Sequence, residues 1–377
     1  MKKITALLLA LTMCLCLFAG CGNSEPASTP AASTPATSDK TDAPADKPAD
    51  EPAEKPADDG KVYTINIDFP NPETAVGYKV LVEWEKYVEE QSNGRLDIKV
   101  YSGGALGALP DCVTNCTSGL TDGFWSGVTI YPGVFPGTEV MGLPMMGAKN
   151  FDVVNKVLND LLENYPVISA EWDDLYVVTL HSSTGSPILF KDDIGTIENM
   201  AGYNLRLSNA YTSNWLANKG SNPVSCGIND GYESISKAVI DGGLFFFDQV
   251  QSSALHEVID SIYVGETIYP LNMLCLNRDV YEGLPADLQA VIDESGDFFL
   301  EKSIQFFEEQ KAYLIGVLEE ADVNIIYETE ESREFLAKDA EQAWALWVEK
   351  MSEYGYDGQD ILDTALELIE KYNAEVE

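Results

Sequence analysis

Short alternating strands and amphipathic helices follow one another near residue 60, and this order restricts the fold more than any other feature. Residues 62–69 (VYTINIDF) alternate between apolar and polar side chains, which predicts a strand. Residues 78–94 predict a helix that ends at Asn93-Gly94. A second alternating strand, RLDIKVY, and a short helix in GALPDCVTNCTSG come next. The order strand, helix, strand, helix predicts an α/β fold built in layers.

The remaining chain continues this pattern with strongly apolar strands and longer helices. Buried strands are predicted at 175–183, 244–250 and 271–277. Helices are predicted at 151–166, 233–243, 285–321, 332–355 and 358–374. The sequence shows no internal repeat. We therefore expect one α/β unit over residues 61–377, long enough for two lobes.

The first sixty residues differ from this pattern. Residues 1–20 have two lysines, an apolar run and the ending FAG, which predict a secretory signal peptide. The stretch FAGC resembles a bacterial lipobox and implies cleavage before Cys21 and a lipid on that cysteine; ordinary cleavage that leaves a thiol is the alternative. Residues 21–60 are rich in Pro, Ala and Asp and contain no aromatic residue, so we expect a disordered tether.

The chain is strongly acidic. It has 62 Asp and Glu against 23 Lys and Arg, a formal net charge of −39. Binding to phosphate backbones needs clustered Lys and Arg, so the composition argues against nucleic acid as a partner. Exposed charges are screened within about 8 Å at physiological salt, so this acidity says little about a small ligand.

Signs of catalytic or metal chemistry are missing from the sequence. It contains no G-x-S-x-G elbow, no Walker-type phosphate loop and no H-E-x-x-H. The two histidines, His181 and His256, leave little for a general base or a zinc site. We expect neither an enzyme nor a cofactor. Disulfides cannot be assigned from the spacing of Cys112, Cys116, Cys226 and Cys275.

Five segments together resemble the DctP-type solute-binding subunits of tripartite ATP-independent periplasmic (TRAP) transporters. The first segment matches a helix, a Ser-x-Gly-Arg turn and a strand, and the second matches a Gly-x-x-Asp motif. The third matches a strand with the motif Gly-x-x-x-Arg. The fourth matches the helix and strand before the family's ligand-contacting loop, and the fifth matches a stretch with Leu-Pro. Tyr281 stands where the family has tryptophan in the last of them. In order, the segments are 85–107, 118–123, 194–207, 222–250 and 276–292. They cover nearly all of 61–377.

The resemblance implies a fold and a function. The fold is a two-lobed, periplasmic-binding-protein-like (type II-like) α/β structure whose lobes are joined by crossing strands and a long helix. The lobes are expected at about 61–182 with 268–320, and at about 183–267 with 321–377. The implied protein is an extracytoplasmic monomer, lipid-anchored to the membrane, that captures a small organic acid between the lobes and delivers it to TRAP permease subunits.

Arg206 is the strongest candidate binding residue. In YNLRL, alternation places Tyr203, Leu205 and Leu207 on one face of a strand and Arg206 on the other. The planar guanidinium can make two parallel charge-assisted hydrogen bonds to a carboxylate. The resemblance implies the same role for this position. A salt bridge to one of the many local acids is the alternative.

Six further residues are weaker candidates for ligand contact. Gln249 follows a predicted strand, and Phe247, two positions earlier, would share its face. The others are Trp125, where the first lobe meets the cleft, Phe69 at the end of the first strand, and Ser208 and Asn209 after Arg206. A turn residue is the alternative for Gln249, and core packing is the alternative for Phe247 and Trp125.

One departure from the family concerns the ligand's charge. Many members bring a second arginine into the site just before the segment that matches 187–191, but HSSTGSPILF contains none. We therefore expect a monocarboxylate with an apolar or aromatic body. Two other functions stay open at this point. They are a binding subunit of an ATP-driven importer or a ligand sensor, and a lipid-anchored enzyme.

Overall fold

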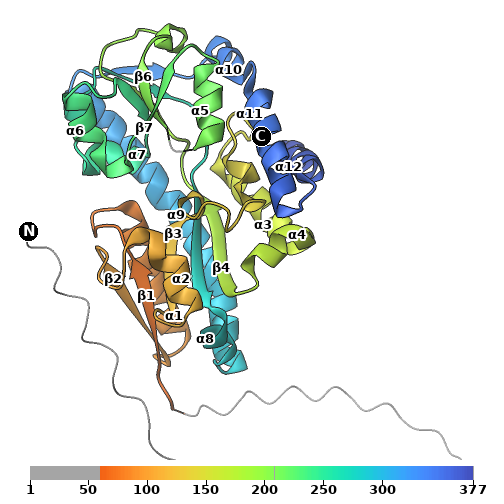
Figure 1. The fold of residues 1–377 in the computed structure, drawn as a ribbon. Helices are drawn as coiled ribbons and strands as arrows, with labels where there is room; N and C mark the ends of the chain where they lie inside the picture. Colours follow the sequence, from red (N-terminus) through yellow and green to blue (C-terminus); the bar gives the residue numbers. More distant parts are fainter. Residues whose placement is uncertain (1–59, 208, 377) are drawn as a thin grey trace, which may run out of the picture. The chain divides into compact units, whose positions relative to one another are not determined.

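The computed structural model describes residues 60–207 and 209–376, which form two β-sheets surrounded by helices (Figure 1). The signal peptide, the tether, Cys21 and Ser208 lie outside the described residues. Within the described ranges, no helix is both long and apolar enough to cross a membrane.

The first sheet has five strands in the order β2-β1-β3-β10-β4. β1 runs parallel to β2 and β3, whereas β10 is antiparallel to both β3 and β4. The alternation predicted for residues 62–69 is confirmed, because Ile65 and Ile67 are buried on one face of β1. The strand bounds are β1 Tyr63–Phe69, β2 Leu96–Ser102, β3 Gly123–Gly127, β4 Leu175–Ser182 and β10 Leu271–Asn277.

The second sheet has six short strands in the order β11-β9-β5-β8-β6-β7. β5 is antiparallel to β8 and β9, whereas β6 is parallel to β7 and β8. The strand bounds are β5 Ile188–Phe190, β6 Asn204–Leu207, β7 Asn222–Ser225, β8 Gly242–Leu244, β9 Ser261–Val264 and β11 Asn324–Tyr327.

Three segments connect the two sheets. The chain passes from β4 to β5, returns from β9 to β10, and then enters the long helix α9 (Ala286–Glu320), which leads to β11 (Figure 1). α9 packs against α1 and β4 on the side of the first sheet, and against α7 and β11 on the side of the second. The two-lobed α/β architecture with crossing strands and a long helix is confirmed.

The other helices pack on these sheets and supply most of the apolar core. α1 is buried through Val80, Leu81, Trp84 and Val88, which lie three to four residues apart as a helix requires. The bounds are α1 Val76–Gln91, α2 Cys112–Thr117, α3 Phe151–Asn164, α4 Pro166–Ser169, α5 Ala210–Ala217, α6 Gly231–Ser236, α7 Phe247–Ser252, α8 Arg278–Glu282, α10 Glu330–Ala337, α11 Ala340–Met351 and α12 Gly358–Asn373.

The C-terminal helices differ from the sequence prediction in one way. The helix predicted at 332–355 is divided at Asp339, whose φ of 64° is left-handed, into α10 and α11. The last helix, α12, packs on α3, with which Ile361, Leu362 and Ala365 share one hydrophobic cluster. The apolar face of α12 is thus buried on the half that contains the first sheet.

Candidate functional site

Arg206 lies in the middle of β6, between β7 and β8 of the second sheet. Leu205 and Leu207 are buried in an apolar cluster with Phe190 and Trp215, as the alternation predicts. The opposite face carries Arg206, of which only 6% is exposed. The strand is thus fixed from behind by leucines and holds the guanidinium in a buried position.

Backbone carbonyls hold the guanidinium of Arg206. Nε donates to the carbonyl oxygen of Cys226 at 3.1 Å, and Nη1 donates to that of Leu244 at 2.7 Å. The ring of Phe245 lies under the cation, 5.2 Å from Cζ to the ring centroid. Nη2 donates to no group among the described residues and keeps some accessible surface. The side chain is oriented, and one nitrogen stays open for another partner.

The four arginines of the chain differ in their counterions. Arg95 pairs with Asp287, Arg333 with Glu328, and Arg278 with Glu282 at 4.0 Å. Arg206 forms no ion pair with any residue in 60–207 or 209–376, and its burial lowers its pKa through desolvation. A buried cation without a counterion is unfavourable, so this position suits an anionic ligand.

Two glycines allow the strands to approach Arg206. Gly243 on β8 has φ +146°, and a Cβ there would lie 2.5 Å from the backbone nitrogen of Arg206. A Cβ at Gly242 would lie only 1.9 Å from the carbonyl oxygen of Leu189 on β5. We read Gly242-Gly243 in the sequence as the end of a helix, whereas the pair forms part of β8. A Gly-Gly pair before an apolar run was the signal for this close packing.

Trp125 lies on β3 of the first sheet and is 7% exposed. Its indole Nε1 donates to Nε2 of His181 at 3.0 Å, and its ring lies 5.3 Å from that of Phe69. Phe69 is fully buried, and a Cβ at Gly77 of α1 would be 3.1–3.2 Å from both aromatic rings. Phe69 therefore packs behind Trp125. No sequence pattern indicates that His181 is the hydrogen-bond partner of Trp125.

His181 is the last but one residue of β4 and is fully buried. Burial lowers the pKa of its imidazole to about 4. The following residues, Ser182 to Pro187, connect the sheets and carry no charged side chain. The segment between the two sheets, in which the resemblance led us to look for a second arginine, thus contains only uncharged side chains.

Phe247 and Gln249 lie in α7, not in the strand predicted at 244–250. That strand prediction was wrong: β8 ends at Leu244, because a short apolar run fits a buried helix as well as a buried strand. Two residues apart on a helix are about 200° apart, so Phe247 and Gln249 do not share a face. Phe247 is buried against α9, and Oε1 of Gln249 accepts from the backbone nitrogen of Phe246 at 3.4 Å.

A cavity of about 690 Å³ lies between α1, α7 and α9. This volume is within the range of small-molecule sites, about 300–1,000 Å³. Asp248, between the two candidates of α7, lines it, and desolvation raises the pKa of its carboxyl to about 6. The residues that line it are Thr74, Val76, Lys79, Asp248, Gln251, Ser252, Phe306, Glu309, Gln310 and Tyr313. None of the predicted binding residues lines it, although Val76 neighbours Gly77 and thus Trp125.

Asn209 has a structural role in the helix after Arg206. It is the N-cap of α5, and its Oδ1 accepts from the backbone nitrogen of Thr212 at 2.9 Å. Oγ1 of Thr212 donates back to the same oxygen at 3.0 Å. The side chain is half-buried. Its capping role is clear from these bonds, while ligand contact stays a prediction.

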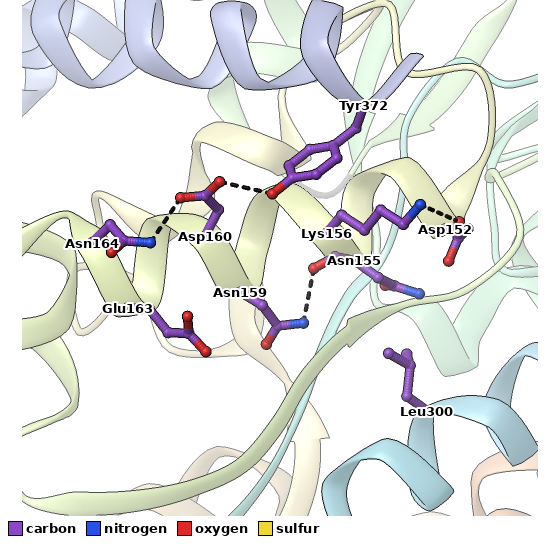
Figure 2. A pocket seen from close by; sticks show the side chains of 9 residues that line it. All are labelled: Asp152, Asn155, Lys156, Asn159, Asp160, Glu163, Asn164, Leu300 and Tyr372. Atoms are coloured by element: carbon purple, nitrogen blue, oxygen red, sulfur yellow. Dashed lines mark hydrogen bonds and ion pairs between the residues drawn. The ribbon is translucent and has the colours of Figure 1, made fainter. Parts of the chain in front are cut away.

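A second cavity, of about 380 Å³, follows the polar face of α3 (Figure 2). Its polar groups bind one another: Asp160 accepts from Tyr372 at 2.8 Å and from Asn164 at 2.9 Å, and Lys156 pairs with Asp152 at 3.5 Å. None of the predicted binding residues lines this groove. It is a solvated surface feature of the α3–α12 pair.

No group of three or more His, Cys, Asp or Glu side chains within the described ranges is arranged to hold a metal ion. The four cysteines in this part of the chain are free thiols. Cys112 and Cys116 share the buried face of α2, and desolvation raises the pKa of each thiol to about 12. These two cysteines are therefore core residues.

Comparisons with known proteins agree with this architecture. A solute-binding protein of Chromohalobacter salexigens is 25% identical over 231 residues, 60% of this chain and 68% of its own. The crystal structure of a TRAP solute-binding protein from a marine metagenome, specific for aromatic acid ligands, contains 3-hydroxybenzoate. It matches this chain with a TM-score of 0.75 and 21% identity, over 83% of this chain and 99% of that one. One from Rhodoferax ferrireducens with copurified benzoate has a TM-score of 0.74 and 22% identity, covering 84% and 99%.

The family model described as bacterial extracellular solute-binding protein, family 7, matches residues 69–351. This span contains both sheets except β1, of which it includes only Phe69, and it contains Trp125, His181 and Arg206. Members of the family are extracytoplasmic receptors of TRAP transporters, which bind small organic acids and work with membrane permease subunits. The chain belongs to this family, the DctP-type solute-binding proteins.

Proposed function

We propose that this protein captures a small organic monocarboxylate with an aromatic or branched apolar body, and that Arg206 binds the carboxylate. The single observation that carries the proposal is the buried guanidinium of Arg206, which has no counterion among the described residues. Cys226 and Leu244 orient the side chain through their carbonyl oxygens. A carboxylate at Nη2 would complete the fork with charge-assisted hydrogen bonds.

The uncharged side chains of residues 182–187 support a single negative charge on the ligand. Residues 182–187 contain no cation, and His181 is held neutral by burial. A second carboxylate would be desolvated there without a partner, which is unfavourable. Trp125 on the first sheet supplies an aromatic surface that suits a planar or branched body. The aromatic acids bound by the two solved relatives above are consistent with this choice.

Capture then takes place by lobe closure. The acid bridges Arg206 on one half and aromatic groups on the other, so it favours the closed state by its extra contacts there. The closed protein, a monomer tethered through a lipid on Cys21, delivers the acid to its permease without altering it chemically. The crossing segments and α9 are the parts that must bend.

A thermal-shift panel tests the proposed ligand class. Benzoate, 3-hydroxybenzoate and a branched monoacid are expected to raise the melting temperature, because binding to the native state alone stabilises it. Succinate and other diacids are expected to have no effect. Stabilisation by the diacids and not by the monoacids would overturn the proposal.

A further inference from the structure

The inference starts from the hydrogen bond between Trp125 and His181, which crosses a strand of the first sheet. β10 lies between β3 and β4, with Trp125 opposite Leu274 and His181 opposite Asn272. Residues directly opposite in a sheet point to the same face, as do residues two apart on one strand. Trp125 and His181 therefore lie on one face, and the indole reaches over β10 to the imidazole.

The direction of this hydrogen bond is fixed by the chemistry of the two rings. An indole can only donate, so Nε2 of His181 must be the acceptor and carry no proton. The ring proton then resides on Nδ1, which lies 3.3 Å from the carbonyl oxygen of Ser182. Burial favours the neutral imidazole, because it lowers the pKa to about 4. At neutral pH the acceptor is thus always present.

The imidazole itself is held rigidly. Its ring packs edge-on against Phe299, with centroids 5.3 Å apart, and lies 6.5 Å from that of Phe307. Both phenylalanines belong to α9. His181 is also paired with β10 through its backbone and directly precedes the segment that crosses to the second sheet. A fixed acceptor at this point determines the orientation of any donor that binds it.

Among the described residues, Trp125 has no other hydrogen-bond partner for its indole N–H. Its ring also lies 5.3 Å from that of Phe69 and close to the backbone of α1 at Gly77. These apolar surfaces restrict the indole's position but favour no particular direction of the N–H group. Only His181 selects one direction, because any other would leave a buried donor unsatisfied.

We propose that His181 is a positioning residue: by accepting the indole N–H it fixes the orientation in which Trp125 faces the bound acid. This inference rests on the proposed function, in which Trp125 forms an aromatic wall of the site. It assigns His181 an indirect role in recognition, without contact to the ligand.

Two matched variants test the inference. His181→Gln keeps a strong acceptor at similar reach, whereas His181→Met has a similar length and only a weakly accepting thioether sulfur. In ¹⁵N-labelled protein without ligand, the indole N–H resonance of Trp125 is identified by its loss in Trp125→Phe. We expect this resonance to move upfield and exchange faster in His181→Met, and to stay near the wild-type position in His181→Gln.

Benzoate titration calorimetry supplies the functional result. We expect His181→Met to bind benzoate about tenfold more weakly and His181→Gln to retain affinity within about threefold. An unchanged indole resonance in His181→Met, or equal losses of affinity in both variants, would overturn the proposal. If the wild type binds neither benzoate, 3-hydroxybenzoate nor a branched monoacid, the proposed function is contradicted, and the indole resonance still decides whether His181 orients Trp125.

A measurement on the wild type covers the case in which His181→Met does not fold. Long-range ¹⁵N spectra of the His181 ring are expected to show a proton on Nδ1 and none on Nε2. The Nε2 signal should shift in Trp125→Phe, which keeps an aromatic ring but loses the donor. A ring protonated on Nε2 would refute the inference.

Discussion

Trp125 on the first sheet and Arg206 on the second are both buried, but their polar atoms are satisfied in different ways. The indole has a complete hydrogen bond to a neutral side chain, His181. The guanidinium has two backbone carbonyls, no carboxylate and one nitrogen without a partner among the described residues. The indole of Trp125 is fully hydrogen-bonded without a ligand, whereas the guanidinium of Arg206 has no counterion among the described residues. This difference suggests that shape is recognised on one side and charge on the other.

The largest effect on ligand affinity is expected from a substitution of Arg206. Arg206→Lys should weaken binding of the preferred monoacid at least about 100-fold, because an ammonium cannot reproduce the planar fork. Calorimetry measures the change. Arg333→Lys, at a half-buried arginine paired with Glu328, is the matched control and should bind normally. Equal affinity of Arg206→Lys and wild type would exclude the anchor role.

A backbone change beside Arg206 should have the next largest effect. Gly243→Ala places a Cβ 2.5 Å from the backbone of Arg206 at a φ of +146°, so we expect a loss of about 3 kcal/mol in the free energy of unfolding. Gly316→Ala is the control. No atom lies within 4 Å of its added Cβ, and alanine should stabilise α9 by about 0.5–1 kcal/mol. Denaturant unfolding of both variants measures these free-energy changes. A Gly243→Ala protein as stable as wild type would contradict the close packing of β8 against Arg206.

The stability of the half that contains Trp125 and His181 should depend on pH in the acidic range. The pKa of His181 falls from 6.5 to about 4 on folding, so the unfolded chain binds more protons between these values and stability declines as pH falls through this window. The pKa shift of His181 contributes at most about 3 kcal/mol to the free energy of unfolding. Asp248 and Glu139 have raised pKa values, about 6 and about 7, and act with the opposite sign.

His181→Gln isolates the histidine contribution, because the two carboxyl groups are common to both proteins. The stability difference between wild type and variant should shrink by about 2–3 kcal/mol from pH 6.5 to 4. Urea unfolding at several pH values measures it. A difference that does not depend on pH would mean that His181 is not held neutral.

The smallest expected effect concerns Asn209. Asn209→Ala should cost about 1 kcal/mol of stability, because α5 loses its N-cap, whereas Asn209→Ser keeps a capping oxygen and should cost little. Thermal unfolding separates the two variants. A strong loss of benzoate binding in Asn209→Ser, with stability preserved, would show that Asn209 also contacts the ligand.

The sequence was most informative where periodicity and burial agree. The alternation around Arg206 correctly predicted a strand with leucines on its buried face. The long helix α9 was predicted from the long helical region that begins at Pro285. The apolar run at 244–250 misled because a short buried helix has the same composition as a buried strand. The capping role of Asn209 has a recognisable sequence signal, an asparagine just before a helix.

The bond between Trp125 and His181 could not be found in the same way. The two residues are 56 positions apart and lie on strands separated by β10, whose place in the sheet is a tertiary feature. Likewise, the missing counterion of Arg206 becomes visible only when every acid nearby can be examined. Both features depend on strand order, which a single sequence does not determine.

A crystal structure with a bound monocarboxylate tests the central claim most directly. Benzoate, or an acid retained through native purification, should place both carboxylate oxygens within hydrogen-bonding distance of the Arg206 guanidinium, with Nη2 as one donor. The carbonyl contacts to Cys226 and Leu244 should persist. A carboxylate held by other residues, with Arg206 still bound only to those carbonyls, would contradict the account.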